Sequence, residues 1–407
     1  MKREELYTGV DIGAQSVRVV VGQRKANDEV DILGVGESKL GAESYQANQE
    51  VMVAAVKRAA DEARNMASAP IREVTLGVPG TFLKGVNSKG VVRVRNEQIT
   101  DDDVMRVLEP ASAIPLGEGA RVLKLFPQDY IVDHRPGVKD PRGLHAVRLD
   151  THVHVIVGNH NQIENLRGAV ERTGIGVRDV VPHAVASSEA VLHNGEKELG
   201  VLLLDIGTQA TEVAVWLNGA LHFTTVMGFG GAVLTKDISK GLRLPQVQAE
   251  DIKKRYGTAI ATLVEEDELI EIPTVTGEAT ERRPRKIVAE LIEPRLEDVF
   301  NEVGHMLKET GLENEIRGGC VLTGGTAELN GISDLARDVL GLPVRIGKPE
   351  PRNHLGGMIE YVRSSSMSCA VGLVLYGARG VRGGLYVPTT RTGGRFRRFL
   401  EKVAASF

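Results

Sequence analysis

The sequence is poor in aromatic residues, in cysteine and in net charge, and each shortage argues against a class of protein. Aromatic side chains make up 4% of the 407 residues, which leaves few surfaces on which bases or sugars could stack. A net charge of −4 gives no overall basic surface, so we expect no nucleic-acid partner. The two cysteines, Cys320 and Cys369, lie in apolar segments, which indicates buried thiols in a reducing compartment.

The sequence also lacks a long apolar run. No stretch approaches the roughly 20 residues that a membrane-spanning helix needs, and residues 1–6 lead into a strand without the apolar segment of a secretory signal. We therefore expect any membrane contact to be peripheral. The 42% of hydrophobic residues suffices for proper cores, and the length predicts two large domains or one that is divided into subdomains.

A motif that occurs twice is the most informative feature that the sequence does have. Residues 7–16 and 201–210 each run an apolar strand into Asp-Ile-Gly-x-Gln, and a second strand follows each copy. Such a turn can place backbone N–H groups around a phosphate while its Asp holds a hydrated Mg²⁺. A single Asp-Ile-Gly is common in ordinary tight turns. The repetition, the flanking strands and a later strand that ends at Gly324 and Gly325 together favour a nucleotide clamp between two related halves.

The candidate nucleotide-binding residues lie at the ends of these strands. Asp11 and Asp205 are the candidates for holding Mg²⁺ through water, and the glycines would let the backbone approach the nucleotide closely. The full set is Asp11, Gly13, Ala14, Gln15, Ser16, Asp205, Gly207, Thr208, Gln209, Gly324, Gly325 and Thr326.

The order of strands and helices predicts an α/β chain with two core domains and an insert in each. The segment 7–77 has the strand and helix order of the first half of a ribonuclease-H-like sheet. Thr100 with Asp103 predicts a helix N-terminus within an irregular insert. The predicted boundaries are 6–84 with 161–198 for the first core domain, 85–160 for its inserted subdomain, 199–233 with 305–377 for the second core domain, 234–304 for the second subdomain, 378–394 for a flexible linker and 395–407 for a terminal helix.

As a helix, the last residues would carry an apolar stripe with basic flanks. A basic amphipathic helix on a flexible tether is typical of a segment that lies on a membrane surface. Docking on the protein's own body is the alternative. The stripe consists of Phe396, Phe399, Leu400, Val403 and Phe407.

The paired turns and the Gly-Gly strand resemble the superfamily of actin, sugar kinases and heat-shock chaperone ATPases. Longer stretches are similar to the FtsA family of bacterial cell-division proteins, and the resemblance covers essentially the whole chain. These stretches are 126–130, 137–144, 186–188, 292–295, 321–327 and the tail helix. The resemblance implies an actin-like fold with a distinctive insert at 85–160, ATP with Mg²⁺ as ligand, and a polymerising tether at the inner face of the cytoplasmic membrane.

The resemblance also implies roles for residues outside the turns. Glu250 and Lys253 match a helical Glu-x-x-Lys beside the nucleoside, with an exposed ion pair as the alternative. Glu189 lies where related enzymes keep a residue that orients water, with a helix-surface Glu as the alternative. The implied partners are the C-terminal peptide of FtsZ on 234–304, further copies of the chain in filaments, other division proteins and anionic membrane. Basic residues suited to the peptide are Arg243, Lys286 and Arg295.

Both phosphate loops depart from the family pattern. The first has Ala14 and Ser16 where Thr and Lys are common, so a positive charge is missing there. In the second, at 207–212, two glycines and a following Asp are lost, and side chains restrict the positive-φ conformations that glycines permit. We therefore expect ATP binding with slow hydrolysis at most.

Two other functions remain open. A PilM-like platform of pilus assembly has the same fold but lacks the amphipathic tail on a long linker. A sugar or metabolite kinase of the superfamily needs a carboxylate base at a sugar pocket, and the scarcity of aromatic residues disfavours it.

Overall fold

A computed structural model describes residues 5–40, 48–273, 280–351 and 354–379. The predicted terminal helix and nearly all of the predicted linker lie outside the described residues. No helix among the described residues is long and apolar enough to cross a membrane.

The first core domain is built on a six-stranded sheet. Its middle strands form an antiparallel meander, β3-β2-β1, and β4 and β9 then continue the sheet in parallel with β1. In spatial order the strands are β17 (Leu355–Gly357), β3 (Val30–Lys39), β2 (Ser16–Arg24), β1 (Leu6–Ile12), β4 (Glu73–Val78) and β9 (Gly176–Pro182). The alternating and continuous apolar patterns of these segments match a sheet with both faces covered.

The second core domain repeats this arrangement with five strands. Here β12-β11-β10 form the antiparallel meander, and β15 and β16 follow in parallel, so the order matches β3-β2-β1-β4-β9 strand for strand. The strands are β12 (Ala220–Met227), β11 (Thr211–Leu217), β10 (Val201–Ile206), β15 (Cys320–Thr323) and β16 (Val344–Ile346). The repeated motif in the sequence is thus a repeated domain, and the predicted pair of ribonuclease-H-like halves is confirmed.

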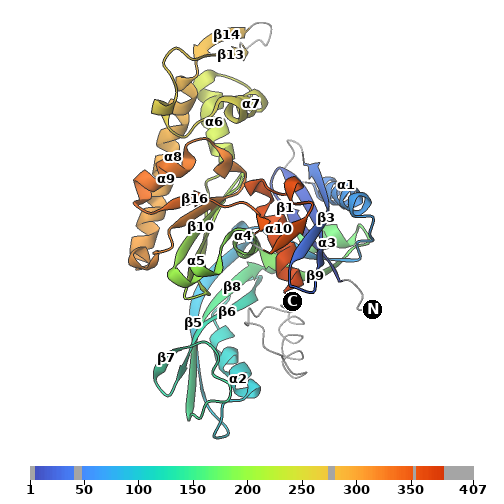
Figure 1. Cartoon of the computed structure of the whole chain (residues 1–407), viewed down its shortest axis with the longest axis vertical. Helices are drawn as coiled ribbons and strands as arrows, with labels where there is room; N and C mark the ends of the chain where they lie inside the picture. The colour runs from blue at the N-terminus through green and yellow to red at the C-terminus, as the bar shows by residue number, and fades with distance from the viewer. Residues whose placement is uncertain (1–4, 41–47, 274–279, 352–353, 380–407) are drawn as a thin grey trace.

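Two helices lie between the sheets. α4 (His183–Val191) and α10 (Ser368–Ala378) pack against each other, and one buried apolar cluster joins them to strands of both halves. Figure 1 shows them near the centre of an elongated molecule. Helices α1 (Gln49–Ala67) and α3 (His160–Glu171) pack on the outer face of the first sheet. α5 (Asn194–Leu199) leads into β10.

The first insert is a four-stranded antiparallel sheet with one helix. The order is β5 (Leu83–Arg93), β8 (Arg148–Asn159), β6 (Ala120–Val132) and β7 (Arg135–Val138). The helix α2 (Asp101–Ser112) begins with the predicted Thr100–Asp103 capping box. This sheet also meets the second half, because His154 Nε2 lies 2.8 Å from Thr224 Oγ1 of β12.

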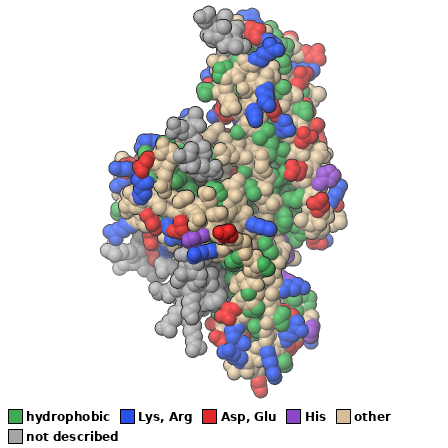
Figure 2. All heavy atoms as spheres, turned by 180° about the vertical axis from the view of Figure 1, so that it is seen from behind, with side chains coloured by type: hydrophobic (Ala, Val, Ile, Leu, Met, Phe, Trp, Pro, Cys, Tyr) green, Lys and Arg blue, Asp and Glu red, His purple; other side chains and the backbone are tan. Residues whose placement is uncertain are grey.

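The second subdomain stands at the opposite end of the molecule (Figure 1). Its helices share the apolar cluster of the second core domain, to which α9 (Ile332–Leu340) also belongs. The elements are α6 (Gly231–Leu242), α7 (Gln246–Tyr256), β13 (Leu269–Pro273), β14 (Thr280–Pro284) and α8 (Lys286–Glu309). The surface of the whole molecule carries charges of both signs. Figure 2 shows basic and acidic side chains interspersed on one face of the molecule and dense at its two ends, which fits the small net charge.

Candidate nucleotide cleft

The two hairpin turns of the repeat share one backbone geometry. Gly13 N–H donates to Ser16 C=O at 3.0 Å, and Gly207 N–H donates to Ala210 C=O at the same 3.0 Å. Both turns line a single cleft with a volume of about 700 Å³. All of the predicted nucleotide-binding residues line it too: Asp11, Gly13, Ala14, Gln15, Ser16, Asp205, Gly207, Thr208, Gln209, Glu250, Lys253, Gly324, Gly325 and Thr326.

The position directly after β15 requires a glycine for steric reasons. Gly324 has a φ of +85°, and a Cβ there would lie 2.4 Å from Asp205 Oδ1. A side chain at this position would therefore strain the backbone and displace a carboxylate of the cleft. Thr326 then ties this turn to the second hairpin turn of the repeat, within the same core domain, by donating from Oγ1 to Gly207 C=O at 3.0 Å.

The floor of the cleft is acidic and holds one imidazole. Asp11 and Asp205 come from the equivalent strands β1 and β10, and Glu212 comes from β11. His183 Nε2 lies 3.3 Å from Asp11 Oδ1, and His183 Nδ1 lies 3.5 Å from Glu212 Oε1. Ser187 donates to Asp205 Oδ2 at 2.5 Å. Three carboxylates and one imidazole thus meet where the two halves face each other.

Glu212 supplies a carboxylate in the second loop, where the Asp of the family pattern is absent. The Glu212 side chain enters the cleft and accepts hydrogen bonds from the Gly80 N–H at 2.8 Å and the Ala184 N–H at 2.9 Å. Both donors belong to the first half, and Ala184 lies in the first turn of α4, where a negative charge is favourable. Glu212 therefore keeps a carboxylate at the cleft and links the two halves.

Burial and crowding shift the proton equilibria of the floor. Burial, and then the charge of Glu212, raise the pKa of Asp205 to about 7. Burial alone would lower the pKa of His183, but Asp11, Glu212 and Asp205 outweigh it and raise that pKa to about 9. At neutral pH the pKa values make His183 a resident imidazolium and leave Asp205 partly ionised.

The Glu-x-x-Lys pair closes another wall of the cleft. Lys253 Nζ lies 2.7 Å from Glu250 Oε2 and donates to Gly231 C=O at 2.8 Å. The two side chains are only 13% and 19% exposed, so the alternative of an exposed ion pair does not describe them. Lys253 thus links α7 to the N-terminus of α6, and the Glu250 and Lys253 side chains form a polar wall of the cleft.

Arg18 is a cleft residue that the sequence analysis missed. It lies directly opposite Asp11 in the β1–β2 register, and its side chain lines the cleft. One of its nitrogens, Nη2, lies 3.0 Å from Glu37 Oε1, while the buried Nε has no hydrogen-bond partner within the described residues. Arg18 thus supplies a positive charge next to the loop in which Ser16 replaces the usual Lys.

The cleft fits a nucleotide with a divalent cation. Asp11 and Asp205 present carboxylate oxygens, which are the ligands and water anchors that Mg²⁺ prefers. Both turns and the positive charge of Arg18 line the same cleft, which suits an anionic phosphate.

Comparison with known proteins decides the family. A family model of the cell division protein FtsA matches residues 202–372, and a model of the SHS2 domain inserted in FtsA matches residues 80–157. The chain is 36% identical over 375 residues to the cell division protein FtsA of Pseudomonas aeruginosa, covering 92% of this chain and 89% of that protein. It is 35% identical over 382 residues to FtsA of Escherichia coli K12, covering 92% and 90%.

The chain belongs to the FtsA family of cell division proteins. FtsA of Bacillus subtilis, at 34% identity over 388 residues, covers 94% of this chain and 86% of that protein. The FtsA model of the SHS2 insert, at 80–157, spans nearly all of the four-stranded sheet of the first insert.

Solved structures agree on the fold. A chain of the PilM–PilN type IV pilus biogenesis complex matches with a TM-score of 0.66 at 17% identity, covering 91% of this chain and 98% of that one. MreB5 of Spiroplasma citri, bound to ADP, matches with a TM-score of 0.53 at 14% identity, covering 90% and 94%. At these identities the likeness shows an actin-like fold and nothing more.

Within this FtsA-like framework, Glu189 lies away from the cleft. Its side chain is fully buried in α4, and Lys197 Nζ lies 2.8 Å from its Oε1, while Arg379 pairs with the other oxygen. Lys197 Nζ also sits 4.4 Å above the ring of Trp216. Glu189 is not among the residues that line the cleft, so the structure contradicts the predicted water-orienting role and also the alternative of a surface Glu.

The three basic residues predicted to bind a partner do not form one site. Arg295 lines a groove between α6 and α8 of about 470 Å³, together with Asp237 and Lys240, and Arg295 Nε lies 2.8 Å from Asp237 Oδ2. Arg243 is exposed at the end of α6, which also contains Lys240. Lys286 lies nine positions before Arg295 on α8, so it faces the opposite side of the helix at about 100° per residue.

Proposed function

We propose that this protein is an ATP-binding, filament-forming member of the FtsA family that tethers a ring of FtsZ to the inner face of the cytoplasmic membrane. The observation that carries the proposal is a cleft between two repeated halves, lined by both phosphate-type turns, in a chain of this family. The actin-like fold supports nucleotide binding, since the matching MreB5 structures are bound to ADP and AMPPNP.

In this proposal the nucleotide is chiefly a structural ligand. Asp11 and Asp205 would hold Mg²⁺ through water, and Arg18 with the two turns would hold the phosphates. A ligand that touches both halves stabilises the closed form in proportion to its saturation. Since Glu189 lies outside the cleft and is ion-paired, no predicted residue remains to orient an attacking water. We therefore expect ATP turnover to be slow or absent.

The groove between α6 and α8 is the proposed site for the C-terminal peptide of FtsZ. Arg295 and Lys240 line it and Arg243 lies close along the chain, so acidic side chains of an extended peptide would gain charge-assisted hydrogen bonds there. Asp237, Glu290 and Asp298 line the same groove, so the peptide must compete with these carboxylates for Arg295 and Lys240. That competition predicts a weak, reversible interaction.

The terminal stripe is the proposed membrane anchor. Burial of one Phe or Leu side chain is worth roughly 1.5–3 kcal/mol, and each basic residue near anionic lipid adds about 1 kcal/mol. The cost of ordering a short helix offsets part of this gain. One tail would therefore bind weakly, whereas a filament would attach firmly because it presents many tails.

The insert at 85–160 is the proposed site of contacts along the filament. Its sheet extends away from the cores (Figure 1) while its attached end packs on β12, so it can reach a neighbouring copy without blocking the cleft. Deletion of the insert should preserve nucleotide binding and abolish polymers. Filaments of normal appearance after the deletion would reject this part of the proposal.

The test is filament formation on anionic lipid vesicles, followed by electron microscopy and co-sedimentation. We expect filaments on vesicles with ATP and Mg²⁺, fewer without nucleotide, and release of the protein when Phe399 and Leu400 are both changed to Glu. A variant truncated after Gly394 should bind ATP but not vesicles. Unchanged co-sedimentation of the truncated chain would show that the tail is not the anchor.

A further inference from the structure

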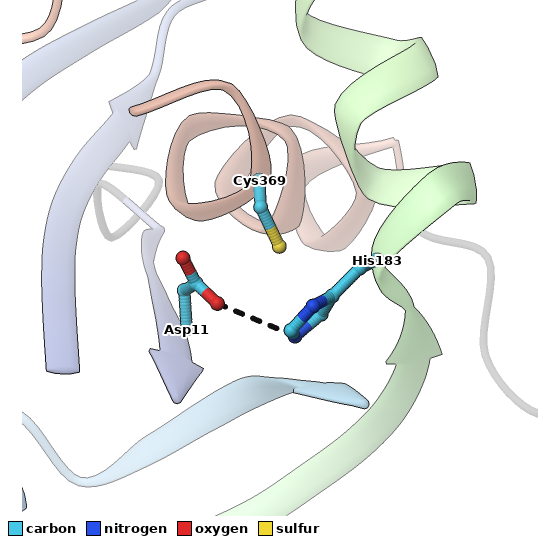
Figure 3. A group of neighbouring side chains, drawn as sticks. All are labelled: Asp11, His183 and Cys369. Atoms are coloured by element: carbon cyan, nitrogen blue, oxygen red, sulfur yellow. Dashed lines mark ion pairs between the residues drawn. The ribbon is translucent and has the colours of Figure 1, made fainter. Parts of the chain in front are cut away.

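Three potential metal ligands from distant parts of the chain converge on the floor of the cleft. Asp11 lies on β1, His183 is the first residue of α4, and Cys369 lies near the start of α10. Figure 3 shows the three side chains pointing toward one another, with the Asp11–His183 ion pair dashed. Their ligand atoms all lie within 4.8 Å of one another, which is close enough for one ion to contact all three after small side-chain adjustments.

The donor set is chemically selective. An oxygen, an imidazole nitrogen and a sulfur form a mixed set that suits Zn²⁺ or Co²⁺. Mg²⁺ prefers oxygen ligands and retains its water, so the sulfur and the nitrogen add little for that ion. The site therefore differs in its chemistry from the Mg²⁺ position proposed for the nucleotide, although Asp11 is common to both.

The imidazole is already held in an orientation suited to binding a metal. Glu212 lies 3.5 Å from His183 Nδ1 and is itself fixed by the N–H groups of Gly80 and Ala184. The other nitrogen, Nε2, is buried, has no hydrogen-bond partner within the described residues and lies on the side of Asp11. A carboxylate behind the imidazole is the usual outer partner of a metal-binding histidine.

The negative charge around Asp11, His183 and Cys369 also favours a bound cation. Asp11, Asp205 and Glu212 all line the floor of the cleft, and His183 lies between Asp11 and Glu212. Cys369 is buried beside Asp11. A bound divalent ion would stabilise a Cys369 thiolate and the carboxylates together.

We propose that Asp11, His183 and Cys369 bind a zinc-class divalent ion in the nucleotide-free cleft. The three residues would serve as ligands and Glu212 as the outer partner of His183. All three line the cleft, so a fourth position stays open to water. The proposal goes beyond nucleotide binding and stands without it, since no ligand atom belongs to a nucleotide.

The test uses Co²⁺ as the probe, added to the full chain without nucleotide. We expect one equivalent to produce a thiolate-to-Co²⁺ charge-transfer band in the near-ultraviolet absorption spectrum. Zn²⁺ should remove the band by displacement, and a large excess of Mg²⁺ should leave it. Absence of the band, or its loss to Mg²⁺ at similar concentration, would overturn the proposal.

Variants assign the band to its ligands. Cys369→Ala should abolish it, while Cys320→Ala is the matched control and should keep it, because Cys320 is buried in β15 and lines no part of the cleft. Glu212→Gln should keep the band and weaken Zn²⁺ binding roughly 10- to 100-fold, as loss of an outer partner does. The same band in Cys369→Ala, or its loss only in Cys320→Ala, would contradict the assignment.

A second variant covers a failure of Cys369→Ala to fold. His183→Gln retains a polar side chain of similar reach, and we expect it to weaken Zn²⁺ binding at least 10-fold in a competition with a chelator. Circular dichroism of each variant establishes that the fold is intact. Unchanged Zn²⁺ affinity in folded His183→Gln would overturn the proposal, whatever the outcome of ATP binding.

Discussion

Buried carboxylates lie at both ends of α4, and the two clusters differ in their charge and in their access to the cleft. At the C-terminal end, Glu189 is matched by Lys197 and Arg379, and Lys197 also covers Trp216. At the N-terminal end, three carboxylates share one imidazole, and they line an open cleft. The Glu189 cluster is closed, and its one carboxylate has two cationic partners. The cluster at the N-terminal end is open, and it has three carboxylates around one imidazole.

The difference separates a structural ion pair from a binding site. A buried carboxylate with its own cations needs no ligand, and breaking the set leaves a buried charge unpaired. Burial, and then the charge of Glu212, raise the pKa of Asp205 to about 7, and the carboxylates around His183 raise its pKa to about 9 against the effect of burial. Strongly shifted pKa values of this kind are concentrated at functional sites, where charged groups are placed close together to bind or react.

The largest effect should come from breaking the closed cluster. Glu189→Ala leaves Lys197 buried without this partner, and we expect unfolding free energy to fall by about 3–5 kcal/mol. Urea unfolding followed by the fluorescence of Trp216, the single tryptophan, measures it. The affinity of the folded fraction for ATP should not change. A loss of stability below about 1 kcal/mol would contradict the structural role.

The open cluster should instead make the free energy of unfolding depend on pH. The folded-state pKa of His183, about 9, lies above its usual 6.5, so its contribution is present below pH 6.5 and is lost as pH rises through 9. The raised pKa of Asp205 acts in the same direction between pH 3.8 and about 7. We expect stability of the metal- and nucleotide-free protein to fall by about 3 kcal/mol from pH 6.5 to 9.

The matched control for this pH dependence is His183→Gln. Its unfolding free energy should fall much less than that of the wild type between pH 6.5 and 9, because the imidazole is gone and the remaining change comes from Asp205 near pH 7. Glu189→Gln should retain the slope of the wild type. Equal slopes in wild type and His183→Gln would show that the imidazole does not carry the effect.

The next effect concerns the charge beside the first loop. Arg18→Gln should weaken the binding of ATP with Mg²⁺ roughly 10- to 100-fold, since a hydrogen bond to a charged group is worth about 1.5–3 kcal/mol. Calorimetry measures it, and Arg18→Lys should recover part of the loss. Arg64→Gln, on the exposed face of α1, is the control and should bind as the wild type does. Equal affinity in Arg18→Gln would remove Arg18 from the site.

The smallest expected effect is on peptide binding and comes from changing an exposed ion pair. Arg295 is 42% exposed and pairs with Asp237, so Arg295→Ala should weaken binding of the FtsZ peptide by about 1 kcal/mol or less. Arg295→Glu should weaken it more, because acidic groups then repel each other. Fluorescence anisotropy of a labelled peptide measures both. No loss in either folded variant would place the peptide elsewhere.

Features that depend on local sequence could be predicted. The repeated Asp-Ile-Gly turns, the capping box at Thr100 and the strand order of the two halves all follow from short patterns. Arg18 was also within reach, because a hairpin closing at Gly13 and Ser16 places it opposite Asp11. Counting the register of the turn would have found the positive charge that the loop itself lacks.

Features that depend on tertiary packing could not be predicted. Cys369 and Asp11 are far apart in the chain, and only the passage of α10 between the sheets brings them together. Glu189 was misassigned because its partners, Lys197 and Arg379, lie on other elements. The reach of the Glu212 side chain to Gly80 across the cleft depends on how the two halves pack, which residue type alone does not show.

The most direct test of the open cluster is calorimetric titration of ATP with Mg²⁺ into wild type, Asp205→Asn and Glu189→Gln. Asp205 holds the cation through water in our proposal, and loss of such an outer partner costs roughly 10- to 100-fold in affinity. We predict that loss for Asp205→Asn and wild-type affinity for folded Glu189→Gln. Equal affinity in wild type and Asp205→Asn would contradict the assignment of the cleft.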